Sequence, residues 1–472
     1  MDGDANMNES RRDFLKTGAK VVGAVAATQR LRAWSTQQTS LAGKERVRVA
    51  ICGLRGRGVS HIEAYTALKN AEIVALCDID GDLLRRRLAE VEKTGARPKT
   101  YTDIRKLLED KSIDAVSIAT PNHWHSLMAI WACQAGKDVY VEKPCSHNLW
   151  EGGQLVRAAA KYSRIVQHGT QSRSDPAVQD AMKKMQDGLL GEIYLSRGLC
   201  FKWRDTIGHA PVSTVPPNVD YDLWTGPAPA KPFTANRFHY NWHWFWDYGN
   251  GDLGNQGVHQ MDMARWGLGL GFPNKISAVG GHVMFDDDQE TPNTLNCTFE
   301  YNLLGGKSRI LEFEVRHWIA NHEAGIGGSH DTAGSPNDSH PKLGPLAGSK
   351  NTVGNIFYGS EGYLAIDSEG GYKSWMGKDQ QAGPSEAGAE EDHFANFIAC
   401  VISRKKDDLK APIEEGHISS GLVHLANVSY RLGRTLIFDP ETQQVKNDEA
   451  ANQLLRDGDR GYRPSFAVPD LV

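Results

Sequence analysis

The chain has 472 residues, of which 40% are hydrophobic and 24% charged, and its 53 basic and 58 acidic residues give a net charge of −5. This length exceeds that of one typical domain, so at least two globular domains are expected. The slight acidic excess gives no indication of a nucleic-acid partner, and no apolar stretch approaches the length of a transmembrane helix.

The first 45 residues are typical of an export signal and linker. Residues 10–16 contain the pair Arg11 and Arg12 in a twin-arginine pattern, and a weakly apolar run follows at residues 17–27. Acidic residues upstream are unusual in a signal, so a chance arginine pair in an N-terminal arm is the alternative. We expect export by the twin-arginine route, which carries folded proteins to the periplasm.

A strand, a glycine turn and a helix follow one another directly after this segment. Val47–Cys52 predicts a buried parallel strand, and residues 59–68 have the apolar spacing of a helix. Such a unit presents free N–H groups and the positive end of a helix dipole to a pyrophosphate. The expected dinucleotide-binding residues of this turn are Gly53, Arg55, Gly56, Arg57 and Gly58.

A second apolar run, Ile73–Cys77, ends at Asp78. A dinucleotide-binding fold has a carboxylate here that accepts hydrogen bonds from the adenine ribose hydroxyls. An anion at this point repels a 2′-phosphate, so NAD is the expected cofactor and NADP is disfavoured. The alternative is an ordinary polar residue at a strand end.

Two later strands end in polar turns. Residues 115–119 lead into Thr-Pro-Asn-His-Trp-His at 120–125, and residues 138–141 lead into Glu-Lys-Pro at 142–144. Ligands of parallel sheets bind beyond the carboxyl ends of strands, so these turns are expected beside the cofactor. No set of residues has metal-ligand spacing, and no metal is expected. The cofactor contacts expected from these turns are Thr120, Pro121, Asn122, His125, Glu142 and Lys143.

These motifs, in this order, resemble the glucose-fructose oxidoreductase / inositol dehydrogenase / MocA family. The resemblance covers most of the chain after residue 45. It implies an α/β fold, with an N-terminal Rossmann domain followed by an α+β domain that has a large, mainly antiparallel sheet. One departure is that Arg55 replaces the usual second glycine of the turn, so the phosphate contact is expected to differ.

The positions of these expected elements along the chain also suggest the domain limits. We expect the NAD-binding domain at 46–167, a second domain at 168–437 and an irregular tail at 438–472. The resemblance implies that the second domain binds substrate and forms a homo-oligomer through its sheet.

The second domain contains an unusual aromatic stretch at residues 238–248, with seven aromatic rings and two histidines in eleven residues. Aromatic faces stack on the C–H faces of sugar rings, which favours a carbohydrate substrate, and Trp244 and Trp246 are the expected contacts. The alternative is that these rings belong to the core, and we expect that of roughly half of them.

A predicted helix over residues 254–266 supplies the remaining catalytic candidates. In the family this segment carries a catalytic histidine, which matches His259, often with an aspartate four residues earlier. That earlier position is Asn255 in this chain, which is expected to contact substrate with His259. Because Asn255 cannot charge an imidazole, Asp262, on the same helix face, or Asp252 is expected to replace the carboxylate.

The resemblance implies an oxidoreductase that transfers hydride between a secondary alcohol of a sugar or polyol and NAD. Lys143 would hold the oxygen and His259 would take its proton. Export favours a tightly bound cofactor, because free NAD is not replenished outside the cytoplasm. One alternative is a glycoside hydrolase that works by transient oxidation, elimination, water addition and re-reduction; another is a non-catalytic sugar-binding protein.

Overall fold

A computed structural model describes the chain from the first predicted strand almost to its end. The described residues are 45–318, 320–321, 323–326, 351–368, 370–389, 392–457 and 461–471. The twin-arginine motif lies outside them, and export stays a prediction. Among the described residues, no helix combines the length and apolar character needed to cross a membrane.

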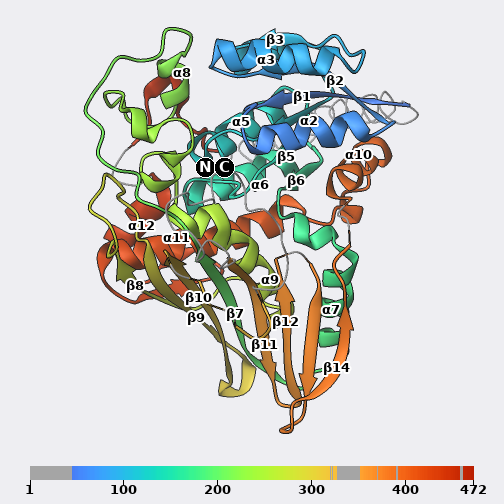
Figure 1. Ribbon diagram of the computed structural model, residues 1–472, viewed down its shortest axis with the longest axis vertical. Coiled ribbons are helices and arrows are strands. Elements are labelled where there is room, and N and C mark those ends of the chain that lie inside the picture. Colours follow the sequence, from blue (N-terminus) through green and yellow to red (C-terminus); the bar gives the residue numbers. More distant parts are fainter. Residues whose placement is uncertain are drawn as a thin grey trace, which may run out of the picture.

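The first domain is built on a six-stranded parallel sheet (Figure 1). Its strand order, β3-β2-β1-β4-β5-β6, is that of a dinucleotide-binding Rossmann fold, with the chain reversing direction across the sheet between β1 and β4. The predicted Rossmann domain is therefore confirmed. The strands are β1 (Val47–Cys52), β2 (Ala71–Cys77), β3 (Lys99–Tyr101), β4 (Ala115–Ile118), β5 (Asp138–Val141) and β6 (Val166–His168).

Helices connect these strands and cover the sheet. Helix α5 is buried along almost its whole length, which explains why its sequence shows little polar face. Helix α3 is capped at its N-terminus by Asp80, whose carboxylate accepts hydrogen bonds from the main-chain N–H groups of Asp82 and Leu83. The helices are α2 (Arg57–Ala67), α3 (Gly81–Glu92), α4 (Ile104–Glu109), α5 (Asn122–Gln134) and α6 (Leu149–Lys161).

The second domain contains a ten-stranded sheet in which every pair is antiparallel except β7 with β10. The predicted large, mainly antiparallel sheet is confirmed. Its strands are β7 (Ile193–Lys202), β8 (Lys275–Gly281), β9 (Thr294–Asn302), β10 (Ser308–His317), β11 (Thr352–Gly359), β12 (Gly362–Asp367), β13 (Tyr372–Met376), β14 (Gln381–Glu386), β15 (Leu436–Asp439) and β16 (Gln444–Val445).

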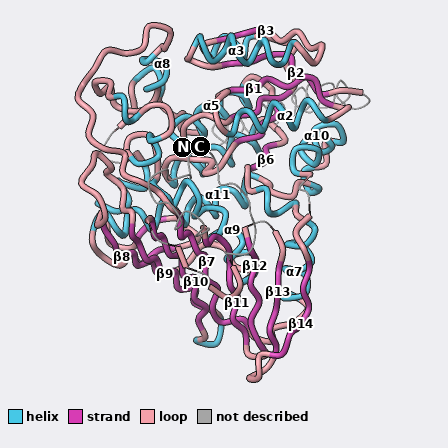
Figure 2. The backbone as a smooth tube through the Cα atoms, viewed as in Figure 1, coloured by secondary structure: helices cyan, strands magenta, loops and turns pink. Residues whose placement is uncertain are grey.

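Helices α7 (Pro176–Gln186), α9 (Val258–Leu268) and α11 (Ile413–Leu432) share one apolar core with this sheet. In Figure 1, α9 and α11 lie between the large sheet and the first domain. Figure 2 shows the chain between β7 and α9 as a long, mostly irregular segment that runs alongside the first domain. It reaches the turn after β2, where Asp80 and Val219 form a β-bridge, so this segment supplies a wall to the edge of the parallel sheet.

The C-terminal part of the chain differs from the irregular tail that the sequence predicts. Strands β15 and β16 extend the large sheet, and α12 (Glu449–Arg456) buries Ala451 and Leu455 against its core. These elements are too short for their apolar spacing to identify them in the sequence.

Late segments also complete the core of the first domain, across the predicted domain boundary. Helix α10 (His393–Ser403) buries Phe397 among residues of β1 and β2, and Phe466 packs edge-on against Trp124 at 5.5 Å between ring centroids. The dinucleotide-binding domain therefore needs residues from the end of the chain for its stability.

Replacing Phe466 by alanine is expected to lower the free energy of unfolding by about 3 kcal/mol, because a large buried ring leaves a cavity. Urea unfolding followed by tryptophan fluorescence measures this change. Leu304→Ala is the matched control, since Leu304 is 99% exposed, and equal midpoints for the two variants would contradict the packing role of Phe466.

Candidate active site

A cavity of about 400 Å³ opens at the carboxyl ends of the central parallel strands. Its opposite wall comes from the second domain and is formed by Leu223, Trp224, His239, Tyr240, Trp242, His243 and Asn255. The structure brings together most of the predicted cofactor residues here. Those that line the cavity are Gly53, Arg55, Gly56, Arg57, Asp78, Thr120, Pro121, Asn122, His125, Glu142 and Lys143.

Two glycines of the first turn, Gly53 and Gly58, are required by close backbone contacts. Gly53 has a φ of +83°, and a Cβ atom there would lie 2.6 Å from the main-chain oxygen of Ala119. Gly58 does not line the cavity, but a Cβ atom on it would lie 1.9 Å from the oxygen of Gly53. Helix α2 begins at this turn with no side-chain cap, and the N–H groups of Gly58 and Val59 donate to the main-chain oxygens of Arg55 and Gly56, both at 3.0 Å. The positive end of the helix dipole therefore lies at the cavity, where it favours a phosphate.

Asp78 is held at the tip of β2 by the main chain. Its Oδ2 accepts a hydrogen bond from the N–H of Leu54 at 2.8 Å, and its Oδ1 accepts one from the N–H of Asp80 at 3.0 Å. Burial raises the pKa of Asp78 to about 6, so the carboxylate is ionised at neutral pH. Each oxygen keeps a lone pair for a ribose hydroxyl. The glycine turn and this carboxylate therefore fit a dinucleotide.

Glu142 links several elements beneath the cavity. Its Oε1 accepts hydrogen bonds from Arg57 Nε and Gln171 Nε2, both at 2.9 Å, and lies 3.1 Å from His61 Nε2. Although burial alone would raise it, Arg57 and His61 hold the pKa of Glu142 well below its usual range. This buried anion therefore fixes the first residue of α2 beside the Glu-Lys-Pro turn.

Lys143 crosses from the first domain to the second. Its Nζ donates a hydrogen bond to the main-chain oxygen of Asn255, within a π-helical turn at Leu253–Gly257. The sequence predicts a regular helix here, whereas the structure has this π turn followed by α9. Widened turns of this kind are frequent at functional sites. Burial lowers the pKa of Lys143 to about 8, against the opposing effect of Glu142, so the ammonium form prevails at neutral pH.

The side chain of Asn255 is bound by a neighbouring carboxylate. Its Nδ2 lies 3.2 Å from Asp252 Oδ1 and 3.3 Å from the hydroxyl of Tyr240. Asp252 also forms a two-point ion pair with Arg204, at 2.8 and 2.9 Å, which with His317 holds its pKa well below the usual range against the effect of burial. An aspartate at 255 would face this charge, whereas an amide donates to it.

His259 lies on α9, is half-buried and is not among the residues that line the cavity. Burial lowers its pKa to about 3, and the nearby charge of Lys143 adds to the effect. The imidazole is therefore neutral at ordinary pH and close enough to Lys143 to interact with it electrostatically.

Asp262 does not join His259. Its carboxylate accepts hydrogen bonds from Arg173 at 2.7 and 2.9 Å and from Ser419, and Arg173 lowers the pKa of Asp262 to about 2 against the effect of burial. The expectation that Asp262 supplies an acid/base carboxylate needs correction, because an ion pair inside the second domain uses both oxygens.

Trp244 and Trp246 do not line this cavity, contrary to the expected substrate role. The ring of Trp244 is buried under the guanidinium of Arg204, at 5.0 Å, where it supports the ion pair with Asp252. The ring of Trp246 lines a separate cavity of about 50 Å³.

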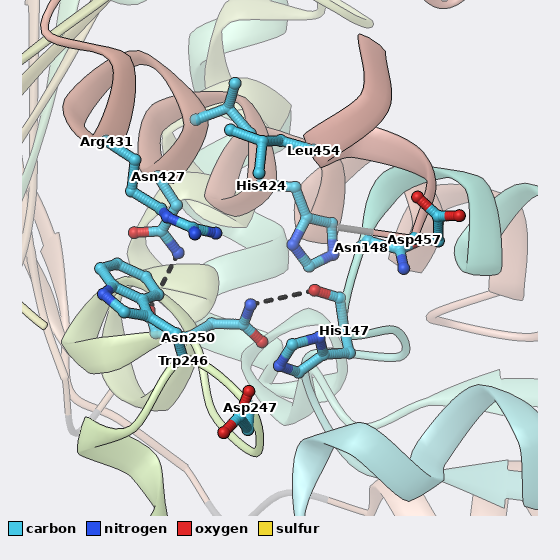
Figure 3. Close-up of a pocket in the computed structure, with 11 residues that line it drawn as sticks. His147, Asn148, Trp246, Asp247, Asn250, His424, Asn427, Arg431, Leu454 and Asp457 are labelled. Carbon is cyan, nitrogen blue, oxygen red and sulfur yellow. Dashed lines mark hydrogen bonds between the residues drawn. The ribbon is translucent and has the colours of Figure 1, made fainter. Parts of the chain in front are cut away.

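Figure 3 shows this second cavity, with Trp246 near Asn250 and Arg431. The Arg431 guanidinium lies over the ring of Trp246 at 5.1 Å. Asn250 Nδ2 donates to the main-chain oxygen of His147, and Asn427 Nδ2 donates to that of Asn250, both at 3.1 Å. These contacts fix the loop before the π turn, so Trp246 has a packing role here.

Other members of the aromatic stretch line the main cavity and were not predicted. They are His239, Tyr240, Trp242 and His243. The segment forms a 3₁₀ turn at Asn241–Trp244, so the spacing of its rings along the sequence could not tell which of them face the cavity. Among the described residues, no group of three or more His, Cys, Asp or Glu side chains could hold a metal ion.

The parallel sheet, the glycine turn and the cavity across two domains define a dinucleotide-binding oxidoreductase fold. The profile of the Gfo/Idh/MocA oxidoreductase family matches the chain at residues 47–170, as the NAD-binding Rossmann fold, and at residues 174–297 and 378–464, as the C-terminal alpha/beta domain. The chain belongs to the Gfo/Idh/MocA family.

Solved structures with this fold include two named enzymes. The WlbA dehydrogenase from Bordetella pertussis, in complex with NADH and UDP-GlcNAcA, is 18% identical with a TM-score of 0.58, over 84% of this chain and 99% of that one. The aldose-aldose oxidoreductase from Caulobacter crescentus, complexed with glycerol, is 16% identical with a TM-score of 0.57, over 83% of this chain and 100% of that one. At these identities the likeness establishes the fold alone.

Glycosyl hydrolase family 109 proteins are similar in sequence. Those from Shewanella baltica (strain OS195) and Shewanella sp. (strain ANA-3) are each 31% identical, over 207 and 210 residues respectively. Each match covers 39% of this chain, and the chain spans less than half, 44%, of the length of these relatives.

Asp78→Asn is expected to reduce the preference for NAD over NADP about tenfold near neutral pH, because it removes one charge facing the 2′ position. In the wild type, NAD binding is expected to weaken as the pH falls through about 6, where Asp78 gains a proton. Titration of nucleotide-free protein with each dinucleotide measures both effects. Asp103→Asn, at another carboxylate lining the cavity, is the control and keeps the wild-type preference.

Proposed function

We propose that the protein is an NAD-dependent oxidoreductase that acts on a secondary alcohol of a sugar or polyol. The observation that carries this proposal is the contact of Lys143 with the π turn of the second domain, which aligns an ammonium with the edge of a dinucleotide-binding sheet. A bound nicotinamide supplies the hydride acceptor.

The residues of the chain handle the alcohol. The turn at 53–58 and Asp78 bind the nucleotide, and Lys143 holds the substrate oxygen through its ammonium group. A positive charge at this point stabilises the negative charge that develops on the oxygen as its proton leaves. His259, neutral and near Lys143, takes that proton.

A second candidate function is a glycoside hydrolase that uses a transient oxidation by the same nucleotide, followed by elimination, water addition and re-reduction. Its support is the 31% identity to glycosyl hydrolase family 109 proteins over 207 residues. Such a reaction requires proton transfers at more than one atom, for which both Lys143 and His259 are candidates.

One experiment separates the two candidates. Purified full-length protein is incubated with a panel of nitrophenyl glycosides without added NAD, and separately with free sugars and added NAD. We expect NADH absorbance with at least one free sugar and no aglycone release. Aglycone release without added NAD would support the hydrolase. Failure of the protein to carry or bind NAD would contradict both.

The oxidation is expected to slow above about pH 8, because Lys143 loses its proton there and no longer stabilises the oxygen anion. Below that pH the rate with saturating NAD should change little, since His259 stays neutral down to about pH 3. Initial rates across this range measure the profile. Lys143→Arg keeps its charge at high pH, so a similar decline in that variant would contradict the assignment.

A further inference from the structure

His243 occupies a defined place in the main cavity that the reaction above does not use. The segment that carries it lies against Gly249, where a Cβ atom would come within 2.5 Å of the main-chain oxygen of His243. The residue is buried apart from the part that lines the cavity. Its main chain is therefore held close to the start of the Gly249–Asn250–Gly251 turn.

The surroundings of the imidazole leave one nitrogen for a ligand. The ring of Trp242 stacks on that of His243 at 3.6 Å, and the ring of Tyr240 lies 4.7 Å away. The Nδ1–H donates to the main-chain oxygen of Tyr240 at 2.6 Å. Nε2 is therefore the atom through which His243 can bind a molecule in the cavity, and in this tautomer it is an acceptor.

A chain of contacts connects His243 to Lys143. Lys143 Nζ donates to the main-chain oxygen of Asn255, Asn255 Nδ2 lies 3.3 Å from the Tyr240 hydroxyl, and Tyr240 accepts from His243. Burial, with the charge of Lys143 as the next cause, lowers the pKa of His243 to about 3, so the ring carries no charge. A neutral acceptor beside an ammonium selects a ligand group that donates a hydrogen bond.

We propose that His243 Nε2 accepts a hydrogen bond from a second hydroxyl of the substrate, close to the hydroxyl that Lys143 holds. This inference rests on the proposed function and narrows it. The substrate is a polyol or sugar with two neighbouring hydroxyls, and a simple alcohol, or a carboxylate at the second position, binds poorly. His243 thereby sets specificity and positions the reacting carbon.

The test compares each sugar that is turned over with its monodeoxy analogues. In the wild type, loss of the hydroxyl that His243 binds should lower kcat/KM about 10- to 100-fold, because a buried acceptor is left unpaired. In His243→Phe, the kcat/KM of the same analogue should be almost equal to that of its parent sugar. His243→Gln retains a hydrogen-bond acceptor, so removal of the hydroxyl should still lower kcat/KM in part, mainly by raising KM.

His239→Phe is the matched control, because its imidazole lines the same cavity near the carboxylate of Asp80, 3.4 Å away, at the nucleotide end. The His239→Phe variant should show the same loss of kcat/KM with the deoxy analogue as the wild type. Circular dichroism and bound-nucleotide content verify that each variant is folded. The proposal would be overturned if every analogue lowered kcat/KM equally in the wild type and in His243→Phe. The proposed oxidoreductase function would not be affected by that result.

A second readout does not depend on turnover. Diethyl pyrocarbonate modifies neutral imidazoles. The whole protein is labelled with D-glucose or myo-inositol present as the probe ligand, and mass spectrometry of its proteolytic peptides then reports the labelling rate at His243. Slower labelling with either ligand supports the hydroxyl contact even if no sugar is oxidised, in which case the proposed function alone fails. If neither ligand slows the labelling and no sugar is oxidised, both the His243 contact and the proposed function are overturned.

Discussion

The site depends on one contact between domains, the hydrogen bond from Lys143 Nζ to the main-chain oxygen of Asn255. Lys143 follows a strand of the parallel sheet, and Asn255 lies in a π turn that precedes α9. Because a main-chain oxygen is the acceptor, the contact does not depend on the side chain at position 255. The ammonium is desolvated and keeps a pKa of about 8, so it is charged but close to its titration point near neutral pH.

The charges on the second-domain wall follow from this arrangement. Arg204 is a buried cation near Lys143 and needs a counter-charge, which Asp252 provides. With that carboxylate present, an amide at 255 is electrostatically better than a second acid, which gives a physical reason for the departure from the family pattern. Neutral imidazoles at His243 and His259 add hydrogen-bonding capacity without further positive charge.

The two candidate functions rest on the same geometry. A dinucleotide-binding edge with the Lys143 ammonium beside neutral hydrogen-bonding groups would serve the proposed dehydrogenase, and it would also serve a hydrolase that oxidises its substrate for part of each cycle. The chemistry on the sugar side, in particular the number of proton-transfer groups that reach the substrate, separates the two. In our proposal that side is the part of the cavity lined by Tyr240, His243 and Asn255.

The strands of the parallel sheet, the glycine turn, and the places of Asp78 and of the Glu-Lys-Pro turn at strand ends could be predicted from the sequence, because each depends on residues close together in the chain. Tertiary structure decided the rest. Asp262 pairs with Arg173, 89 residues earlier, and Trp246 turns to a separate cavity, while a 3₁₀ turn directs His243 into the main one. Which face of an irregular aromatic segment meets a ligand is set by packing between distant elements, and no local spacing encodes it.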